Sequence, residues 1–100
     1  DTNNALKYAT NISGSWAYEV VDGDRMLSDV GSYTSIAIDS SGNVSICYYD
    51  ASYNLLKYAF SHWVMGGTWT KANVDAQSNL AGFYSRAIAV DVNGNPHITY

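Results

Sequence analysis

Hydrophobic and polar residues alternate in short runs along the whole chain, and clusters of Gly, Asn, Asp and Ser separate these runs. Alternation with a period of two is typical of β-strands, in which successive side chains point to opposite faces of a sheet. One stretch of the chain predicts four consecutive strands, over residues 35–39, 44–49, 55–60 and 69–74. The pattern therefore predicts an all-β fold of short antiparallel strands.

The same pattern occurs twice in the chain. The stretch "IAIDSSGNVSI" begins at Ile36 and returns as "IAVDVNGNPHI" at Ile88, and "LKYATNISGSW" at Leu6 returns as "LKYAFSHWVMGGTW" at Leu56. Equivalent residues lie about 50 to 53 positions apart, a period that is typical of propellers, solenoids and arrays. The chain therefore holds two copies of a unit of four strands.

The segments "DSSGN" and "DVNGN" join the first two strands of each copy. An Asp at the start and a Gly at the position that needs a positive φ are typical of a short hairpin with a bulge. Both segments lack the spaced acidic ligands and the closing Glu of a calcium loop, so we interpret them as structural turns.

The first and last strands of a copy differ in polarity. The first has large apolar side chains on one face, Ile36 and Ile38, and small ones on the other, Ser35 and Ala37. This arrangement predicts burial of both faces between packed sheets. The last strand includes charged residues such as Lys71, which indicates an exposed edge.

The two hairpin stretches resemble the first hairpin of NHL-type and related bacterial propeller repeats. The segments "GSW" and "GGTW" resemble a degenerate Asp-box of sialidase-like propellers, although neither Trp16 nor Trp69 is preceded by the Asp at box spacing. The resemblance implies two four-stranded antiparallel β-propeller blades and carries over no sialidase chemistry. Residues 1–30 would form the third and fourth strands of one blade, 31–80 a complete blade, and 81–100 the first two strands of another.

Propellers close with about four to eight blades, so two blades need others to complete a ring. One hypothesis is a homotrimer or homotetramer in which blades are completed between chains, giving six or eight blades. The other is that the chain is a segment of a longer tandem array. Both alternatives stay open from the sequence.

Composition and charge narrow the classes of partner. The chain is 47% hydrophobic and 14% aromatic, which predicts a packed domain. Its net charge of -4, with only five Lys and Arg, argues against binding of nucleic acid, and no apolar run is long enough for a membrane span. Cys47 lies in an alternating apolar run and is predicted to be a buried thiol. High Asn, Ser, Thr and Tyr content favours an extracellular or cell-surface location.

Candidate ligand-binding residues lie in the loops that connect strands and blades. These loops are rich in side chains that bond to or stack on polar ligands such as glycans, although the same residues are common turn formers. Arg86 lies at the start of the first strand of the second copy, so the symmetry of a ring would bring several guanidinium groups together around an anion. The alternative is that Arg86 forms a salt bridge with an Asp of a neighbouring loop. The full set of candidates is Asn3, Asn4, Asp50, Tyr53, Asn54, Trp63 and Arg86.

Catalysis and cofactor binding are not expected. His62 and His97 lack the companion ligands of a zinc site, and no nucleophile or acid–base pair stands out among the scattered carboxylates. The sequence favours a non-enzymatic, lectin-like binding module, for a glycan, a small polar or anionic ligand, or a protein. The alternative is a structural fragment of a larger secreted propeller, or of a sialidase-like hydrolase with its catalytic residues elsewhere.

Overall fold

The computed structural model of the chain describes residues 4–23, 29–61, 68–75 and 87–100. Within these ranges every regular element is a β-strand and no helix occurs, so the prediction of an all-β fold is confirmed. The strands are β1 (Leu6–Thr10), β2 (Ala17–Asp22), β3 (Val30–Ile38), β4 (Val44–Asp50), β5 (Leu55–Ser61), β6 (Trp69–Asp75), β7 (Ala87–Val90) and β8 (Pro96–Thr99). Most lie where the alternation placed them, but β3 begins earlier than predicted.

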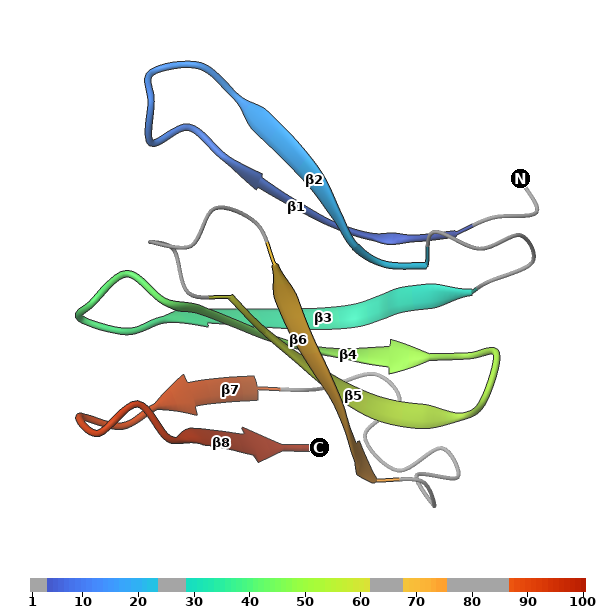
Figure 1. Ribbon diagram of the computed structural model, residues 1–100. Coiled ribbons are helices and arrows are strands. Elements are labelled where there is room, and N and C mark those ends of the chain that lie inside the picture. Colours follow the sequence, from blue (N-terminus) through green and yellow to red (C-terminus); the bar gives the residue numbers. More distant parts are fainter. Residues whose placement is uncertain (1–3, 24–28, 62–67, 76–86) are drawn as a thin grey trace.

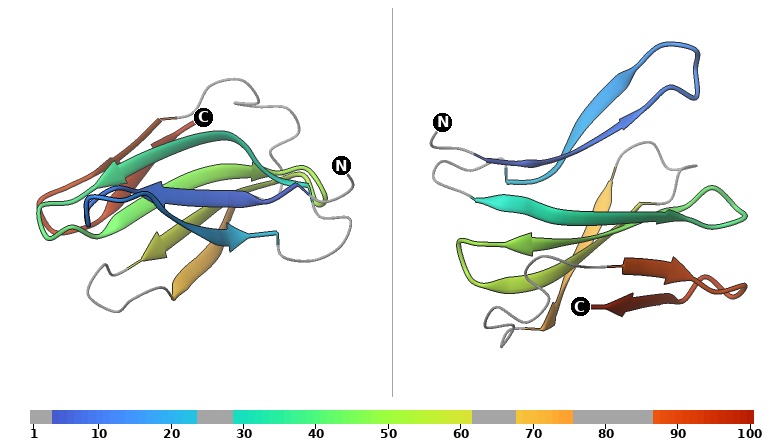
Figure 2. Two further views of the ribbon diagram at one scale, coloured as in Figure 1. Left: turned by 90° about the horizontal axis from the view of Figure 1, so that it is seen from above. Right: turned by 180° about the vertical axis from the view of Figure 1, so that it is seen from behind.

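The described strands pair as one four-stranded sheet and two hairpins. Strands β3, β4, β5 and β6 form the central antiparallel sheet, and β1–β2 and β7–β8 each form a separate two-stranded sheet. Figures 1 and 2 show the two hairpins on either side of the central sheet. The single chain therefore forms one four-stranded sheet and two two-stranded sheets, and not two four-stranded sheets, because the hairpins lie on opposite faces of the central sheet and do not pair with each other.

Strand β4 forms the centre of the core because all seven of its residues are buried. Val44, Ile46 and Tyr48 belong to a cluster with Leu6 and Val21, which come from the β1–β2 hairpin. Since successive side chains alternate, the intervening Ser45 and Cys47 lie on the opposite face, toward β7. The predicted burial of the Cys47 thiol is confirmed. Each apolar side chain removed from water in this way contributes about 1.5 to 3 kcal/mol.

Strand β3 is more exposed than predicted. Ile36 is 51% and Ile38 60% exposed, so the prediction that both faces of the first strand are buried is wrong. The β1–β2 hairpin packs over β4 and leaves this part of β3 uncovered. By contrast, β6 is mostly exposed along its length, which confirms the predicted wet edge strand.

The two hairpin turns share one hydrogen-bonding scheme. Asp39 accepts hydrogen bonds from the backbone N–H groups of Ser41 and Asn43, and Asp91 accepts the equivalent bonds at the second turn. Gly42 and Gly94 adopt φ values of 86° and 83°, the left-handed conformation that favours glycine. The identical bonding explains why the "DSSGN" and "DVNGN" segments were recognisable as turns. The backbone bond from Asn95, together with a hydrogen bond between His97 and the Asp91 carboxylate, lowers the pKa of Asp91 to about 2.

Gly31 allows close approach of β3 to β1, and its replacement is expected to destabilise the fold. A Cβ atom at Gly31, where φ is 96°, would lie 2.9 Å from the Leu6 Cα atom, whereas one at Gly94 would meet nothing within 4 Å. Both Gly→Ala changes strain the backbone, but only Gly31→Ala adds a clash. We expect Gly31→Ala to lower the free energy of unfolding by about 1 to 3 kcal/mol more than Gly94→Ala. Urea denaturation of the two variants measures this difference, and equal losses would contradict the proposed close approach.

Candidate functional site

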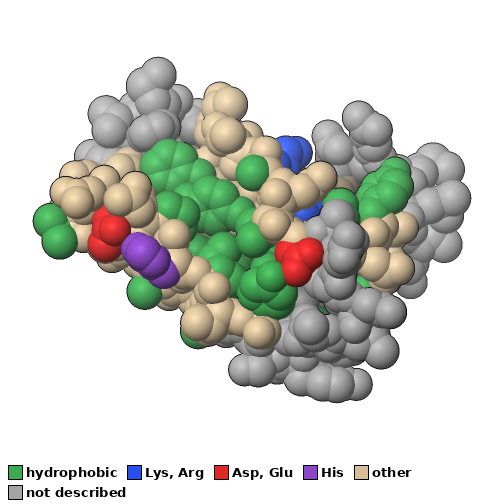
Figure 3. All heavy atoms as spheres, turned by 90° about the horizontal axis from the view of Figure 1, so that it is seen from below, with side chains coloured by type: hydrophobic (Ala, Val, Ile, Leu, Met, Phe, Trp, Pro, Cys, Tyr) green, Lys and Arg blue, Asp and Glu red, His purple; other side chains and the backbone are tan. Residues whose placement is uncertain are grey.

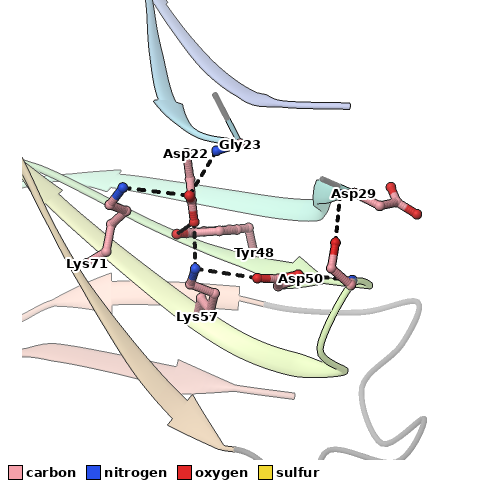
Figure 4. Close-up of polar contacts among 8 residues, drawn as sticks. Asp22, Gly23, Asp29, Tyr48, Asp50, Lys57 and Lys71 are labelled. Carbon is pink, nitrogen blue, oxygen red and sulfur yellow. Dashed lines mark hydrogen bonds and ion pairs between the residues drawn. The ribbon is translucent and has the colours of Figure 1, made fainter. Parts of the chain in front are cut away.

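Asp22, at the end of β2, lies at the centre of a polar cluster between the first hairpin and the central sheet (Figure 4). Its Oδ2 atom accepts hydrogen bonds from Lys57 Nζ at 2.6 Å and from Tyr48 Oη at 2.8 Å. Its Oδ1 atom accepts a bond from the Gly23 backbone N–H, and Lys71 Nζ lies 3.6 Å away. One carboxylate of the hairpin is thus bound by three side chains of the neighbouring sheet.

Asp50 provides the second acidic group of this cluster. Its carboxylate lies 3.4 Å from Lys57 Nζ and accepts a hydrogen bond from the backbone N–H of Ser52. The residue is only 2% exposed, so its charge needs these partners. We refer to Asp22, Tyr48, Asp50, Lys57 and Lys71 as the Asp22 cluster.

The cluster holds its members in fixed protonation states. Burial by itself raises the pKa of Asp22, but hydrogen bonds from Lys57 and Tyr48 and the two lysine charges outweigh it and keep the pKa below the ordinary value. Burial lowers the pKa of Lys57, and the bond and charge of Asp22 reverse this and raise it. Burial, followed by the bond to Asp22, raises the pKa of Tyr48. These shifts move all three groups away from neutral pH, as in a static ion-pair network.

A β-bulge directs the Asp22 side chain toward the next sheet. Between β1 and β2 the pairing changes from Lys7 with Val20 to Leu6 with Asp22, so Val21 is the extra residue. Such a bulge reverses the face to which the following side chain points. The β5–β6 ladder shifts in the same way before Asp75, which is the repeat equivalent of Asp22.

The contact made by Asp22 occurs a second time in the chain. Tyr100 Oη donates a hydrogen bond to Asp75 Oδ2, which joins the central sheet to the segment that follows β8. In the repeat, Tyr100 is equivalent to Tyr48, as Asp75 is to Asp22. Each sheet is therefore joined to the next by the same Asp–Tyr bond.

A second contact lies at the other end of the first sheet junction. Trp69 Nε1 donates to Glu19 Oε1 at 2.8 Å, and the Trp69 ring packs edge-on against Tyr8 with 5.4 Å between ring centroids. Beside it opens a groove of about 520 Å³ between the first hairpin and the central sheet, lined in part by Ile12 and Ile38. The groove is largely apolar at this end of the strands.

Polar groups gather at the opposite end of the strands. Asn4 Nδ2 donates to Asp29 Oδ1, and the Asp29 backbone N–H donates to Ser52 Oγ. Figure 1 places the start of β1 and the turn after β4 at this same end. In that turn Tyr53 is 74% exposed, and Asn54 accepts a bond from the Tyr49 hydroxyl. We call this surface of Asn4, Asp29, Ser52, Tyr53 and Asn54 the loop end.

The structure brings some of the predicted site residues together. Asn4, Tyr53 and Asn54 lie at the loop end, while Asp50 is buried in the Asp22 cluster. Three predicted residues, Asn3, Trp63 and Arg86, lie outside the described residues.

The Asp22 cluster was not predicted from the sequence. Three of its residues recur in the repeat: Asp22 returns as Asp75, Tyr48 as Tyr100, and Lys57 has its equivalent in Lys7. This recurrence of polar side chains at equivalent positions was the available signal.

Other kinds of site receive no support from the described part of the chain. It contains no group of three or more His, Cys, Asp and Glu side chains that could hold a metal ion, and no helix long and apolar enough to cross a membrane.

Comparison with known proteins gives no family for this chain. A scan against protein-family models and searches of curated proteins and solved structures find no match.

The two lysines bound to Asp22 are expected to differ in their contribution to stability. Lys57 is mostly buried and bonds to two carboxylates, whereas Lys71 is 41% exposed and forms one longer ion pair. Lys57→Met leaves buried charges without their partner and should lower the free energy of unfolding by about 2 to 4 kcal/mol. Lys71→Met is the matched control and should cost less than about 1 kcal/mol. Urea titration at pH 7 measures both, and similar losses would refute the central role of Lys57.

Proposed function

We propose that this chain is a non-enzymatic, β-propeller-type binding module that works outside the cell as a ring of three or four copies, with six or eight blades. The observation that supports this proposal is the repeated Asp–Tyr bond, Asp22 to Tyr48 and Asp75 to Tyr100. In the proposed ring, the same contact between successive sheets would give the same rotation at each step. Repeated equal rotations close into a ring when the angle permits.

The exposed surfaces of the chain are consistent with further blades above and below it. Ile36 and Ile38 are exposed on the face of the central sheet next to the first hairpin. Seen from below, hydrophobic side chains also gather across the middle of the opposite side (Figure 3). Exposed apolar side chains on each of two opposite sides are typical of faces that another sheet covers.

The loop end is the proposed ligand-binding surface. Tyr53 offers an exposed aromatic ring, and Asn4, Asp29 and Ser52 offer an amide, a carboxylate and a hydroxyl group beside it. Aromatic rings stack on the apolar faces of sugars, while such polar groups bond to hydroxyls. A ring would repeat this surface several times, so weak single sites would bind a multivalent glycan with high avidity.

The chemistry of the Asp22 cluster suits a structural contact and not acid–base catalysis. Acid–base catalysis near neutral pH needs groups whose pKa lies near 7. In the cluster the shifts of Asp22, Lys57 and Tyr48 all lead away from that range. The cluster therefore suits the joining of two sheets.

The ring is tested by the mass of the native particle, measured by light scattering coupled to size exclusion. We expect about three or four times the mass of one 10.9 kDa chain. The mass should stay constant over a range of loading concentrations, because a closed ring has no free end to extend. A single-chain mass, or a mass that grows without limit, would refute the ring.

The ligand surface is tested at Tyr53. After a screen on an array of neutral and acidic glycans, the best-bound glycan is titrated against Tyr53→Ala. We expect about a tenfold loss of affinity with unchanged urea stability, because the side chain is exposed. Val92→Ala, at an exposed turn residue outside the loop end, is the control and should bind normally. Equal affinity of the two variants would remove Tyr53 from the site.

A further inference from the structure

We propose that a second copy of this chain docks its β7–β8 hairpin on β1, and that Lys7 of one copy binds Asp75 of the second copy. This inference rests on the ring of the proposed function and identifies the surfaces that join its subunits. It follows from comparing equivalent positions of the repeat, some of which are covered within the chain while others are exposed.

The first pair of matching surfaces is apolar. Ile88 and Val90 of β7 are half-buried, and β7 contacts β3 and β4 on the face that carries the buried Ser45 and Cys47. Their repeat equivalents on β3 are the exposed Ile36 and Ile38. Ile88 and Val90 are thus partly covered by the central sheet, whereas the equivalent Ile36 and Ile38 are exposed.

The β7–β8 hairpin carries the residues that would cover Ile36 and Ile38 in a second copy. Small side chains of β3 and β4 face β7, and the corresponding small residues of the hairpin, Ala87, Ala89 and Thr99, are exposed. A second copy could therefore place these small residues over Ile36 and Ile38. The two surfaces are different patches of one chain, as a head-to-tail contact requires.

The second pair of matching surfaces consists of strand edges. In the central sheet β4 pairs with β5, but among the described strands their equivalents β8 and β1 pair only with β7 and β2. Transfer of the β4–β5 register places Thr99 of the second copy opposite Tyr8, since Cys47 pairs with Tyr58. It likewise places His97 of the second copy opposite Thr10. Addition of a strand at such an edge supplies backbone hydrogen bonds along its length.

The third pair of matching surfaces is charged. Lys57 binds Asp22 across the sheet junction, but its equivalent, Lys7, is exposed and forms no ion pair within the described residues. Asp75 already accepts the Tyr100 bond that corresponds to the Tyr48 bond of Asp22. Docking would bring Lys7 of one copy to Asp75 of the second copy and reproduce the core of the Asp22 cluster.

The tryptophan of the aromatic contact between the first hairpin and the central sheet also has an exposed equivalent in the repeat. Trp69 packs against Tyr8, whereas Trp16, at the same position of the repeat, is 62% exposed. In the proposed joint Trp16 would pack on Tyr58 of the second copy, which is equivalent to Tyr8. The groove lined by Tyr8 and Ile38 lies where the incoming hairpin would enter.

A pair of cysteines tests the strand register. Thr10→Cys combined with His97→Cys places the two thiols opposite each other across the joint, so mild oxidation should give covalent oligomers up to the native ring size on a non-reducing gel. Ala9→Cys combined with His97→Cys is the control, because a shift of one residue points the thiols to opposite faces of the sheet. Equal yields from the two variants would overturn the proposed register.

A charge exchange tests the ion pair. Lys7→Asp and Asp75→Lys should each raise the concentration for half-assembly by at least about tenfold, since each places like charges together at the joint. The double variant, which restores opposite charges, should regain most of the assembly. Ser13→Asp, in the exposed β1–β2 turn, controls for the added negative charge and should assemble normally. Single variants that assemble like the wild type would overturn the ion pair.

Ile38→Gln tests the apolar part of the joint without disturbing the fold, because this side chain is already exposed in the single chain. We expect a folded chain that assembles at least about tenfold more weakly. Unchanged assembly would overturn the apolar part of the joint.

The outcomes separate this inference from the proposed function. If the wild-type chain forms a ring of three or four copies but the variant with Thr10→Cys and His97→Cys gives no cross-link, this joint is overturned and the ring is not. A single-chain mass would overturn both.

Discussion

The structure depends on one carboxylate that is shared between sheets. Asp22 belongs to the first hairpin, yet the groups that neutralise and bond it, above all Lys57 and Tyr48, belong to the central sheet. Burying this charge would be costly without those partners. The ion pair therefore constrains the distance and the orientation between two sheets that otherwise meet through apolar side chains, which are less specific in direction.

A local irregularity of the backbone makes this constraint possible. Regular alternation would point Asp22 to the same face as Val20, but the bulge at Val21 turns its carboxylate toward the next sheet. The same irregularity before Asp75 shows that the device belongs to the repeating unit and not to one junction. In the proposed ring, units joined in this way would repeat the same contact from each unit to the next.

The polar and apolar surfaces of the chain are separated in a manner that suits binding by an assembly. The apolar groove and the exposed Ile36 and Ile38 lie on sheet faces that another sheet of the proposed assembly would cover. The loop end, with Tyr53 and Asn4, lies at one end of the strands and remains accessible when sheets stack face to face. The proposed assembly and the proposed ligand binding would therefore use different surfaces of the same unit.

The sequence by itself determined the local features. The alternation located the strands, the Asp and Gly residues located the turns at Asp39 and Asp91, and the repeat related the two halves of the chain. These features follow from interactions between residues that are close in the chain, and a single strand or turn already expresses them.

Only the tertiary structure decided which sheet covers which face. A period of two tells which side chains of β3 share a face, but it does not reveal that Ile36 and Ile38 stay exposed while β4 is covered on both sides. Likewise it does not predict the bulge at Val21, which determines that Asp22 meets Lys57 of another sheet. Both outcomes depend on contacts between residues more than 20 positions apart, as for Asp22 and Tyr48, and such contacts leave no mark on the local pattern of either strand.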